Sequence, residues 1–141
     1  MKKELLAKAS SIKTFIPELT FFNVAGYPHY ENVVSNILQF FFSPKGEHGF
    51  EDLWLKALLN SFQKNANKKI DVESLYVAGD IEREVYTENK KRIDILIPLN
   101  KFVIVIENKI YSGVNNPFEE YHNEIVKRYP DKKIIEILLS I

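Results

Sequence analysis

Two apolar runs decide how this chain folds: Arg92-Ile93-Asp94-Ile95-Leu96-Ile97 and Val103-Ile104-Val105-Ile106-Glu107-Asn108-Lys109. Both are rich in β-branched residues, which favour strands. Each run also carries charge, with Asp94 in the first and Glu107 and Lys109 at the end of the second. A charge in an apolar strand is costly unless it is paired, solvated or bound to a metal, so we expect chemistry at these residues.

The chain on either side of the two runs completes a sheet. Residues 82–86 alternate in polarity, residues 87–91 form a polar turn, and Pro98-Leu99-Asn100 forms the next one. Because these connections are too short for crossovers, three strands at 82–86, 93–97 and 102–110 are predicted to form an antiparallel meander. The helical period from Phe118 to Tyr129 then predicts a crossover helix before a last, parallel strand at 134–141.

Helices are expected before the sheet. Residues 3–13 have helical periodicity, and a second helix begins at Tyr30 or Glu31 and ends at Ser43-Pro44. A third is predicted from Gly49 to Phe62, and its inward stripe is predicted to be Phe50, Leu53, Trp54, Ala57, Leu58 and Phe62. The sequence therefore predicts one α/β domain over residues 1–141. Its mixed sheet has a three-strand antiparallel meander plus one strand after a crossover helix, with extra N-terminal helices.

Composition restricts the classes of function. The 141 residues contain no cysteine, which excludes disulfides, zinc–thiolate sites and thiol nucleophiles and fits a reducing, cytoplasmic compartment. The longest apolar run, residues 102–106, is too short to span a bilayer, so no membrane partner is expected. Basic and acidic residues number 19 each. This balance argues against non-specific coating of nucleic acid, although it does not exclude a nuclease.

Alternation along the strands is expected to gather the charged residues. Glu107 and Lys109 share a face and Asn108 points the other way, because successive side chains alternate. On the preceding strand Asp94 is expected on one face with Arg92 and Leu96, and Ile93, Ile95 and Ile97 on the other. If the two strands pair through the Pro98 turn, two carboxylates and an ammonium group converge at one end of the sheet.

Two carboxylates and a lysine, without histidine or cysteine, suit a hard cation such as Mg²⁺. Asp94 and Glu107 would hold the metal, and the backbone carbonyl of Asn108 is a further candidate ligand. Lys109 would stabilise developing negative charge or orient the attacking water. A salt bridge from Asp94 or Glu107 to Lys109 at a wet strand end explains the same pattern, and spacing alone leaves both interpretations open.

The spacing and its context resemble a known signature. Asp94, a gap of twelve residues and Glu107-Asn108-Lys109 behind four apolar residues resemble the PD-(D/E)XK nuclease superfamily. The expected order of elements is similar to the restriction-endonuclease-like core of that superfamily. Within it, the helix that starts Glu31-Asn32-Val33-Val34-Ser35, followed by Ser43-Pro44 and His48-Gly49, resembles a bacterial branch of uncharacterised predicted nucleases. The resemblance covers residues 30–141.

The resemblance implies metal-dependent hydrolysis of phosphodiesters, in DNA rather than RNA, with Mg²⁺ or Mn²⁺. It implies that Asp94 and Glu107 bind the metal, that Lys109 assists the nucleophile, and that Glu31 adds a ligand or water contact. A first-turn carboxylate stabilised by the helix dipole is the simpler interpretation of Glu31. Contacts to backbone phosphate are predicted for Lys90, Lys91 and Arg92, for which solvated loop charge is the alternative. Glu84 is either a further ligand or an exposed edge-strand carboxylate.

Two departures keep a second function open. The related branch commonly has a Gln where this chain has Pro117, and the last strand leaves an apolar edge that proteins normally cover or pair. A homodimer, the boundary of a C-terminally truncated fragment or a shortened gene would each account for that edge. The alternative function is therefore a catalytically inactive nuclease-fold protein that acts as a protein-interaction or self-associating module. A third is a structural domain with an ordinary Asp–Lys bridge.

Overall fold

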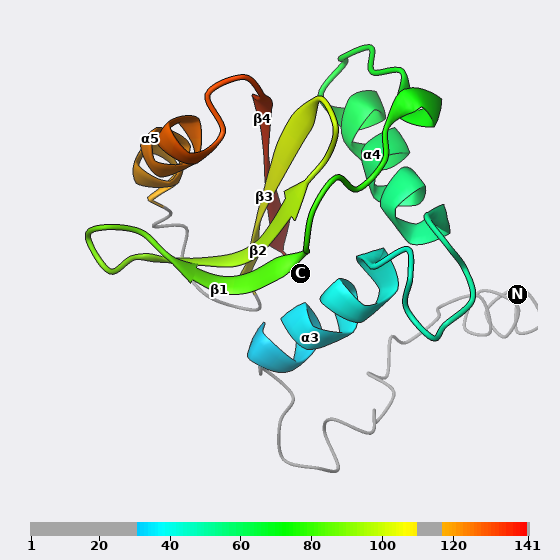
Figure 1. Ribbon diagram of the computed structural model, residues 1–141, viewed down its shortest axis with the longest axis horizontal. Helices are drawn as coiled ribbons and strands as arrows, with labels where there is room; N and C mark the ends of the chain where they lie inside the picture. The colour runs from blue at the N-terminus through cyan, green and yellow to red at the C-terminus, as the bar shows by residue number, and fades with distance from the viewer. Residues whose placement is uncertain (1–30, 110–116, 141) are drawn as a thin grey trace, which may run out of the picture.

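The computed structural model of the chain describes residues 31–109 and 117–140 (Figure 1). The helix expected at residues 3–13 and the possible helix start at Tyr30 lie outside this part. In chain order the elements are α3 (Glu31–Phe42), α4 (Leu53–Asn65), a 3-10 turn η1 (Val72–Ser74), β1 (Glu82–Tyr86), β2 (Arg92–Pro98), β3 (Phe102–Lys109), α5 (Phe118–Arg128) and β4 (Lys133–Ser140).

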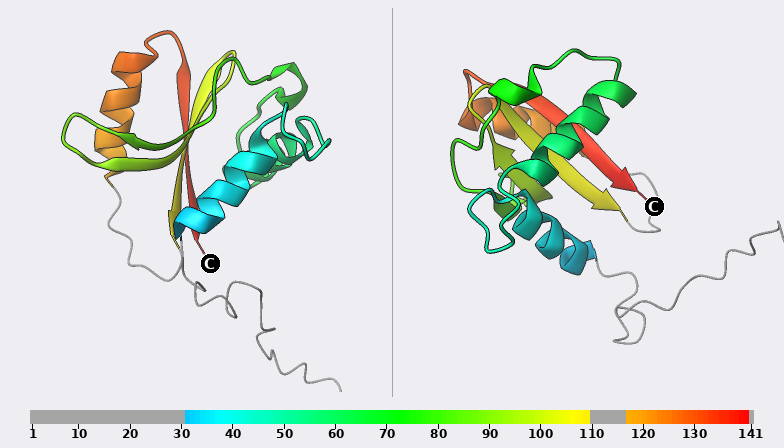
Figure 2. Two further views of the ribbon diagram at one scale, coloured as in Figure 1. Left: turned by 60° about the horizontal axis from the view of Figure 1, so that its bottom comes forward. Right: turned by 90° about the vertical axis from the view of Figure 1, so that its right-hand side faces the viewer.

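The four strands form one sheet in the order β1-β2-β3-β4. The pairs β1–β2 and β2–β3 are antiparallel, whereas β3 and β4 are parallel and are connected through α5. Helix α5 covers one face of the sheet, and α3 and α4 lie on the other (Figure 2). The predicted mixed α/β architecture, a meander followed by a crossover helix and a parallel strand, is confirmed.

An apolar core fills each side of the sheet. On the side of α3 and α4, strand residues such as Ile97 and Ile104 pack with Leu55 and Leu59 of α4. On the side of α5, Val103 and Val105 pack with the helix. Strand β3 therefore contributes to both cores, and this explains why residues 103–106 are apolar without interruption and completely buried.

The alternation of β2 slips by one residue at Asp94, which corrects one expectation. Ile93 packs in the α5 core together with Leu96, whereas Ile95 packs on the opposite side. The β2–β3 register runs only as far as Ile95↔Ile106, and beyond it the Asp94 carboxylate accepts the backbone N–H of Asn108 at 2.9 Å. A side chain that bonds the neighbouring strand in this way interrupts the regular ladder.

The neighbouring strand is irregular at the same place. Glu84 lies between Arg83 and Val85, which pair with Ile95 and Ile93, so it sits opposite Asp94. Its φ of 53° is left-handed, a conformation that is uncommon for a residue with a side chain and costs energy. Both strands thus depart from regular geometry beside the charged residues.

The predicted inward stripe of α4 is wrong in its N-terminal part. The helix begins at Leu53 rather than Gly49, because Gly49 and Glu51 adopt left-handed φ values of 70° and 50° and turn the chain first. Its buried residues are Leu55 and Leu59, with Leu58 and Phe62 partly buried beside them. The other four residues of the predicted stripe are exposed: Phe50, Leu53, Trp54 and Ala57. The rings of Phe41, His48, Phe50 and Trp54 pack against one another.

Candidate active site

Glu107 and Lys109 form a close ion pair at the end of β3. Lys109 Nζ lies 2.9 Å from Glu107 Oε1, so the two side chains share a face as predicted. The Glu107 side chain is only 5% exposed and that of Lys109 is 24% exposed. The amine is therefore accessible to a substrate while the carboxylate is almost completely buried.

Asp94 is the second buried carboxylate of this group. Its side chain is 6% exposed, and its Oδ2 accepts the N–H of Asn108 at the end of β3. Because Asn108 is the chain neighbour of both Glu107 and Lys109, this bond places the Asp94 carboxylate beside the end of β3 that carries the ion pair. The structure thus brings Asp94, Glu107 and Lys109 together at one end of the sheet.

Glu31 joins this group from the first residue of α3. Its Oε2 lies 4.0 Å from Lys109 Nζ. The helix start is held to β3 by the side chain of Asn108, whose Nδ2 donates to the backbone carbonyl of Glu31 at 3.1 Å and to Ser35 Oγ at 3.5 Å. Asn108 therefore faces α3, opposite to Glu107 and Lys109, as the alternation predicts.

Burial has the largest effect on the pKa of Glu107, and the hydrogen bond between the two side chains has the largest effect on the pKa of Lys109. Desolvation raises the pKa of Glu107, the hydrogen bond from Lys109 lowers it, and the charge of Asp94 raises it again. The hydrogen bond with Glu107 raises the pKa of Lys109, so the amine stays protonated at neutral pH. A positive charge is thus held beside two carboxylates that repel each other.

Tyr121, a buried residue of α5, is a member of the site that none of the sequence motifs indicated. Its hydroxyl donates to the backbone carbonyl of Arg92 at 2.6 Å and lies 3.4 Å from Glu107 Oε2. Burial and the charge of Glu107 raise the pKa of the Tyr121 phenol, so it remains a donor. The sequence contained one indication of this role, because a tyrosine on the buried face of a helix needs a hydrogen-bond partner for its hydroxyl.

The three predicted phosphate contacts fall into two groups. Lys90 and Lys91 are exposed in the turn between β1 and β2. Arg92 instead points its guanidinium group at Glu84, Asp94 and Asn32. Contact with phosphate stays a prediction for all three residues.

A family model described as the PD-(D/E)XK nuclease superfamily matches residues 19–141. The chain belongs to this superfamily. The four-strand mixed sheet with its helices is consistent with the restriction-endonuclease-like fold. Comparisons with curated proteins and with solved structures returned no match.

Nucleases of the PD-(D/E)XK superfamily typically depend on Mg²⁺ or Mn²⁺. Within residues 31–109 and 117–140, no three Asp, Glu, His or Cys side chains are gathered closely enough to form a metal cage on their own. The donors nevertheless fit Mg²⁺, which usually binds one or two carboxylates and keeps several waters. Asp94 and Glu107 supply two carboxylates. Burial, and after it the charge of Asp94, raises the pKa of Glu107, and a cation beside the two carboxylates would favour their charged forms.

Two further observations bear on this nuclease-superfamily chain. None of the helices in the described residues is long and apolar enough to cross a membrane.

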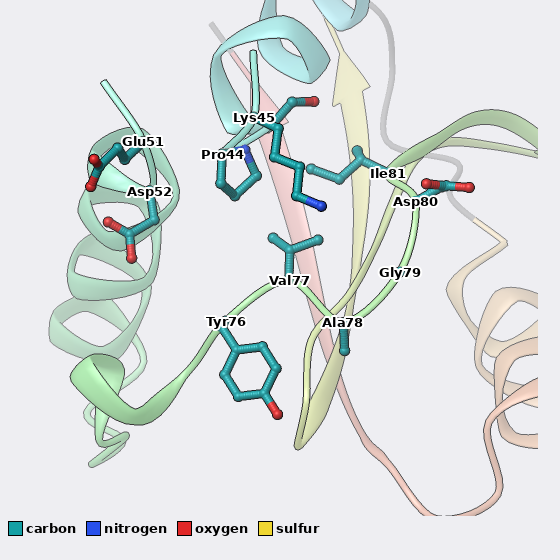
Figure 3. A pocket seen from close by; sticks show the side chains of 11 residues that line it. Pro44, Lys45, Glu51, Asp52, Tyr76, Val77, Ala78, Gly79, Asp80 and Ile81 are labelled. Carbon is teal, nitrogen blue, oxygen red and sulfur yellow. The ribbon is translucent and has the colours of Figure 1, made fainter. Parts of the chain in front are cut away.

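A cavity of about 730 Å³ lies between the loop after α3 and the segment before β1, lined by residues 43–45, 51–52 and 76–81 (Figure 3). The lining of this cavity includes none of the predicted site residues that the structure describes, so it is separate from the charged group.

Proposed function

We propose that this protein hydrolyses phosphodiester bonds in DNA with Mg²⁺ or Mn²⁺ as cofactor. The observation that carries the proposal is the pair of buried carboxylates, Asp94 and Glu107, with Lys109 Nζ 2.9 Å from Glu107 in a chain of the PD-(D/E)XK superfamily. Burying two carboxylates at a strand end beside a partly exposed amine costs free energy, and a structural role does not require three charges at one place.

The metal would be held by Asp94 and Glu107. In a strand the N–H and C=O of one residue point to the same edge. Since the N–H of Asn108 bonds Asp94, its carbonyl points to the edge where that carboxylate lies and is the third proposed ligand. When bound, Mg²⁺ would polarise the phosphodiester and neutralise charge on its oxygens.

Lys109 is proposed to act on the reacting water or on the developing negative charge. Its amine is protonated, partly exposed and fixed by Glu107. A fixed positive charge in a partly buried site stabilises a transition state more than it does in water. Glu31, at 4.0 Å from this amine, is proposed to orient Lys109 or a water beside it.

Lys90 and Lys91 are proposed to contact backbone phosphate outside the reacting bond.

The test is cleavage of plasmid, single-stranded DNA and RNA by the wild type with Mg²⁺, with Mn²⁺ and with chelator. We expect metal-dependent cleavage of DNA, and a loss of about 100-fold or more in Asp94→Asn, because a metal ligand is removed. Asp80→Asn, which changes an aspartate in the separate cavity, is the matched control. Equal cleavage by wild type and Asp94→Asn would reject this site.

Pro117 supports the second candidate, a catalytically inactive module that binds a protein partner or itself. It precedes α5 and its carbonyl accepts the N–H of Tyr121 at 3.0 Å, but its side chain has no hydrogen-bonding group. Thermal unfolding against Mg²⁺ concentration separates the candidates. An enzyme is stabilised by a ligand that binds only the folded state, by about 2.7 kcal/mol at 100 times Kd. An inactive module that does not bind the metal shows no such shift.

The single domain, the cytoplasmic location and the homodimer stay predictions. Strand β4 is at the edge of the described sheet and pairs only with β3 there. Its outer edge is therefore the surface on which a homodimer is proposed to form. Sedimentation at several protein concentrations tests this, and a single monomeric species at every concentration would reject it.

A further inference from the structure

Arg92 connects three elements of the fold through one guanidinium group. Its Nη1 donates to Glu84 Oε1 on β1 at 3.1 Å. Its Nη2 donates to Asn32 Oδ1 on α3 at 3.2 Å and lies 3.4 Å from Asp94 Oδ1 on its own strand. Asn32 is 60 positions away in the sequence, so this contact is long-range.

Each partner of Arg92 lies beside a residue of the proposed centre. Asn32 directly follows Glu31 at the start of α3, and Asp94 is itself a proposed metal ligand. Asp94 is thereby held at both oxygens, with Oδ1 facing Arg92 and Oδ2 facing the N–H of Asn108. A planar guanidinium group with several donors fixes such a carboxylate better than an ammonium group, which acts as a point charge.

Glu84 supplies the charge that keeps Arg92 in place. Its left-handed φ of 53° interrupts the regular course of β1 opposite Asp94, and its carboxylate meets Arg92. The Arg92 side chain is 33% exposed and that of Glu84 is 41% exposed. Backbone strain of this kind persists only where surrounding contacts stabilise it.

We propose that Arg92 is a positioning residue of the nuclease centre, which orients Asp94 and docks the start of α3 so that Glu31 lies beside Lys109. This inference rests on the proposed function. It assigns the guanidinium group to Glu84, Asp94 and Asn32 rather than to substrate phosphate. Residues that orient a metal ligand in this way commonly change metal affinity or activity by about 10- to 100-fold when they are replaced.

The test compares Arg92→Met and Arg92→Lys with the wild type, and Arg128→Met is the matched control. Arg128 also pairs with a glutamate of β1, Glu82, but its guanidinium contacts none of the proposed centre among the described residues. Calorimetric titration with Mn²⁺ in the absence of DNA measures metal affinity. In Arg92→Met we expect the Kd to rise about 10-fold or more, with kcat falling and KM for DNA nearly unchanged.

Arg92→Lys restores the charge but not the planar fork, so we expect it to recover only a small part of the metal affinity. A phosphate contact would behave differently. In that case KM for DNA would rise in Arg92→Met, and the salt dependence of DNA binding would correspond to about one counterion fewer. Arg92→Lys would then largely restore the wild-type KM. That result, or a wild-type metal affinity in Arg92→Met, would overturn the proposal.

Glu84→Gln is a milder variant, in case Arg92→Met does not fold. It leaves Arg92 in place but removes its charged anchor, so we expect the metal affinity to weaken by a smaller factor. An unchanged metal affinity in this variant would also count against the positioning role.

A metal-free measurement separates this proposal from the proposed function. In chelator, the Tm changes of Arg92→Met and Asp94→Asn are expected to be non-additive in the double variant, because the two residues act as a unit. If the wild type binds no metal but this coupling is present, the proposed function fails and the positioning role stands. If the wild type cleaves DNA and the two changes are additive, the positioning role fails.

Discussion

Glu107 is a buried carboxylate of the site whose pKa is raised. Burial raises its pKa above the ordinary value of 4.5, and the neighbouring charge of Asp94 adds to that shift, while Lys109 opposes it. Without metal, burial therefore makes the charged form of the Glu107 carboxylate less favourable than it is in water. Sites that bind cations or transfer protons commonly contain such groups.

The raised pKa of Glu107 predicts a pH dependence of stability without metal. The folded state binds this proton more tightly than the unfolded state, so its contribution is fully present below about pH 4.5 and is lost as pH rises through the raised pKa. In chelator, Glu107→Gln should therefore gain stability relative to the wild type as pH rises over this range. Thermal unfolding at a series of pH values measures the difference. Parallel curves for the two proteins would show that the pKa of Glu107 is not raised.

Tyr121 gives a second prediction at the scale of single residues. Tyr121→Phe removes the donor to the carbonyl of Arg92, which leaves a buried acceptor without that partner, and should cost about 1–3 kcal/mol of unfolding free energy. Tyr86→Phe is the control. Because Tyr86 is 65% exposed, the loss of its hydroxyl should change the free energy of unfolding little. Urea denaturation measures both. Equal stability of the two variants would show that the Tyr121 hydroxyl contributes nothing beyond its ring.

At the scale of elements, most bounds of the described strands and helices follow from periodicity, and each error has an identifiable structural cause. Ile93 could not be assigned to the α5 core because the slip depends on a side-chain bond from Asp94 to the next strand. The start of α4 was missed because left-handed φ values at Gly49 and Glu51 delay the helix. The contact of Arg92 with Asn32 needs the packing of α3, which no local pattern contains.

The observed phase of α4 can be tested by two substitutions in the same helix. Leu59 is 1% exposed in the core, so Leu59→Ala should cost about 2–5 kcal/mol of unfolding free energy. Trp54 is 45% exposed, so Trp54→Ala should cost clearly less although it removes a larger side chain. Denaturant titrations of both variants provide the comparison. A larger loss for Trp54→Ala would support the predicted stripe instead of the observed one.

At the scale of the whole molecule, the site lies where the layers of the fold meet. Strands β2 and β3 supply Asp94, Glu107 and Lys109, α3 brings Glu31 from one side and α5 brings Tyr121 from the other. The sequence could predict the three strand residues because they are close in the chain and follow a strand pattern. Tyr121 and the network around Arg92 depend on how the helices dock, so they required the structure.

Plasmid cleavage by Lys109→Met at saturating Mg²⁺ tests most directly whether Lys109 acts in metal-dependent cleavage of DNA. Lys127→Met is the matched control, because Lys127 pairs with Glu88 at the same 2.9 Å but on the surface of α5. We expect the rate to fall about 100-fold or more in Lys109→Met, since a fixed charge at the reacting group is lost, and to be unchanged in Lys127→Met. Wild-type cleavage by Lys109→Met would contradict this role of Lys109.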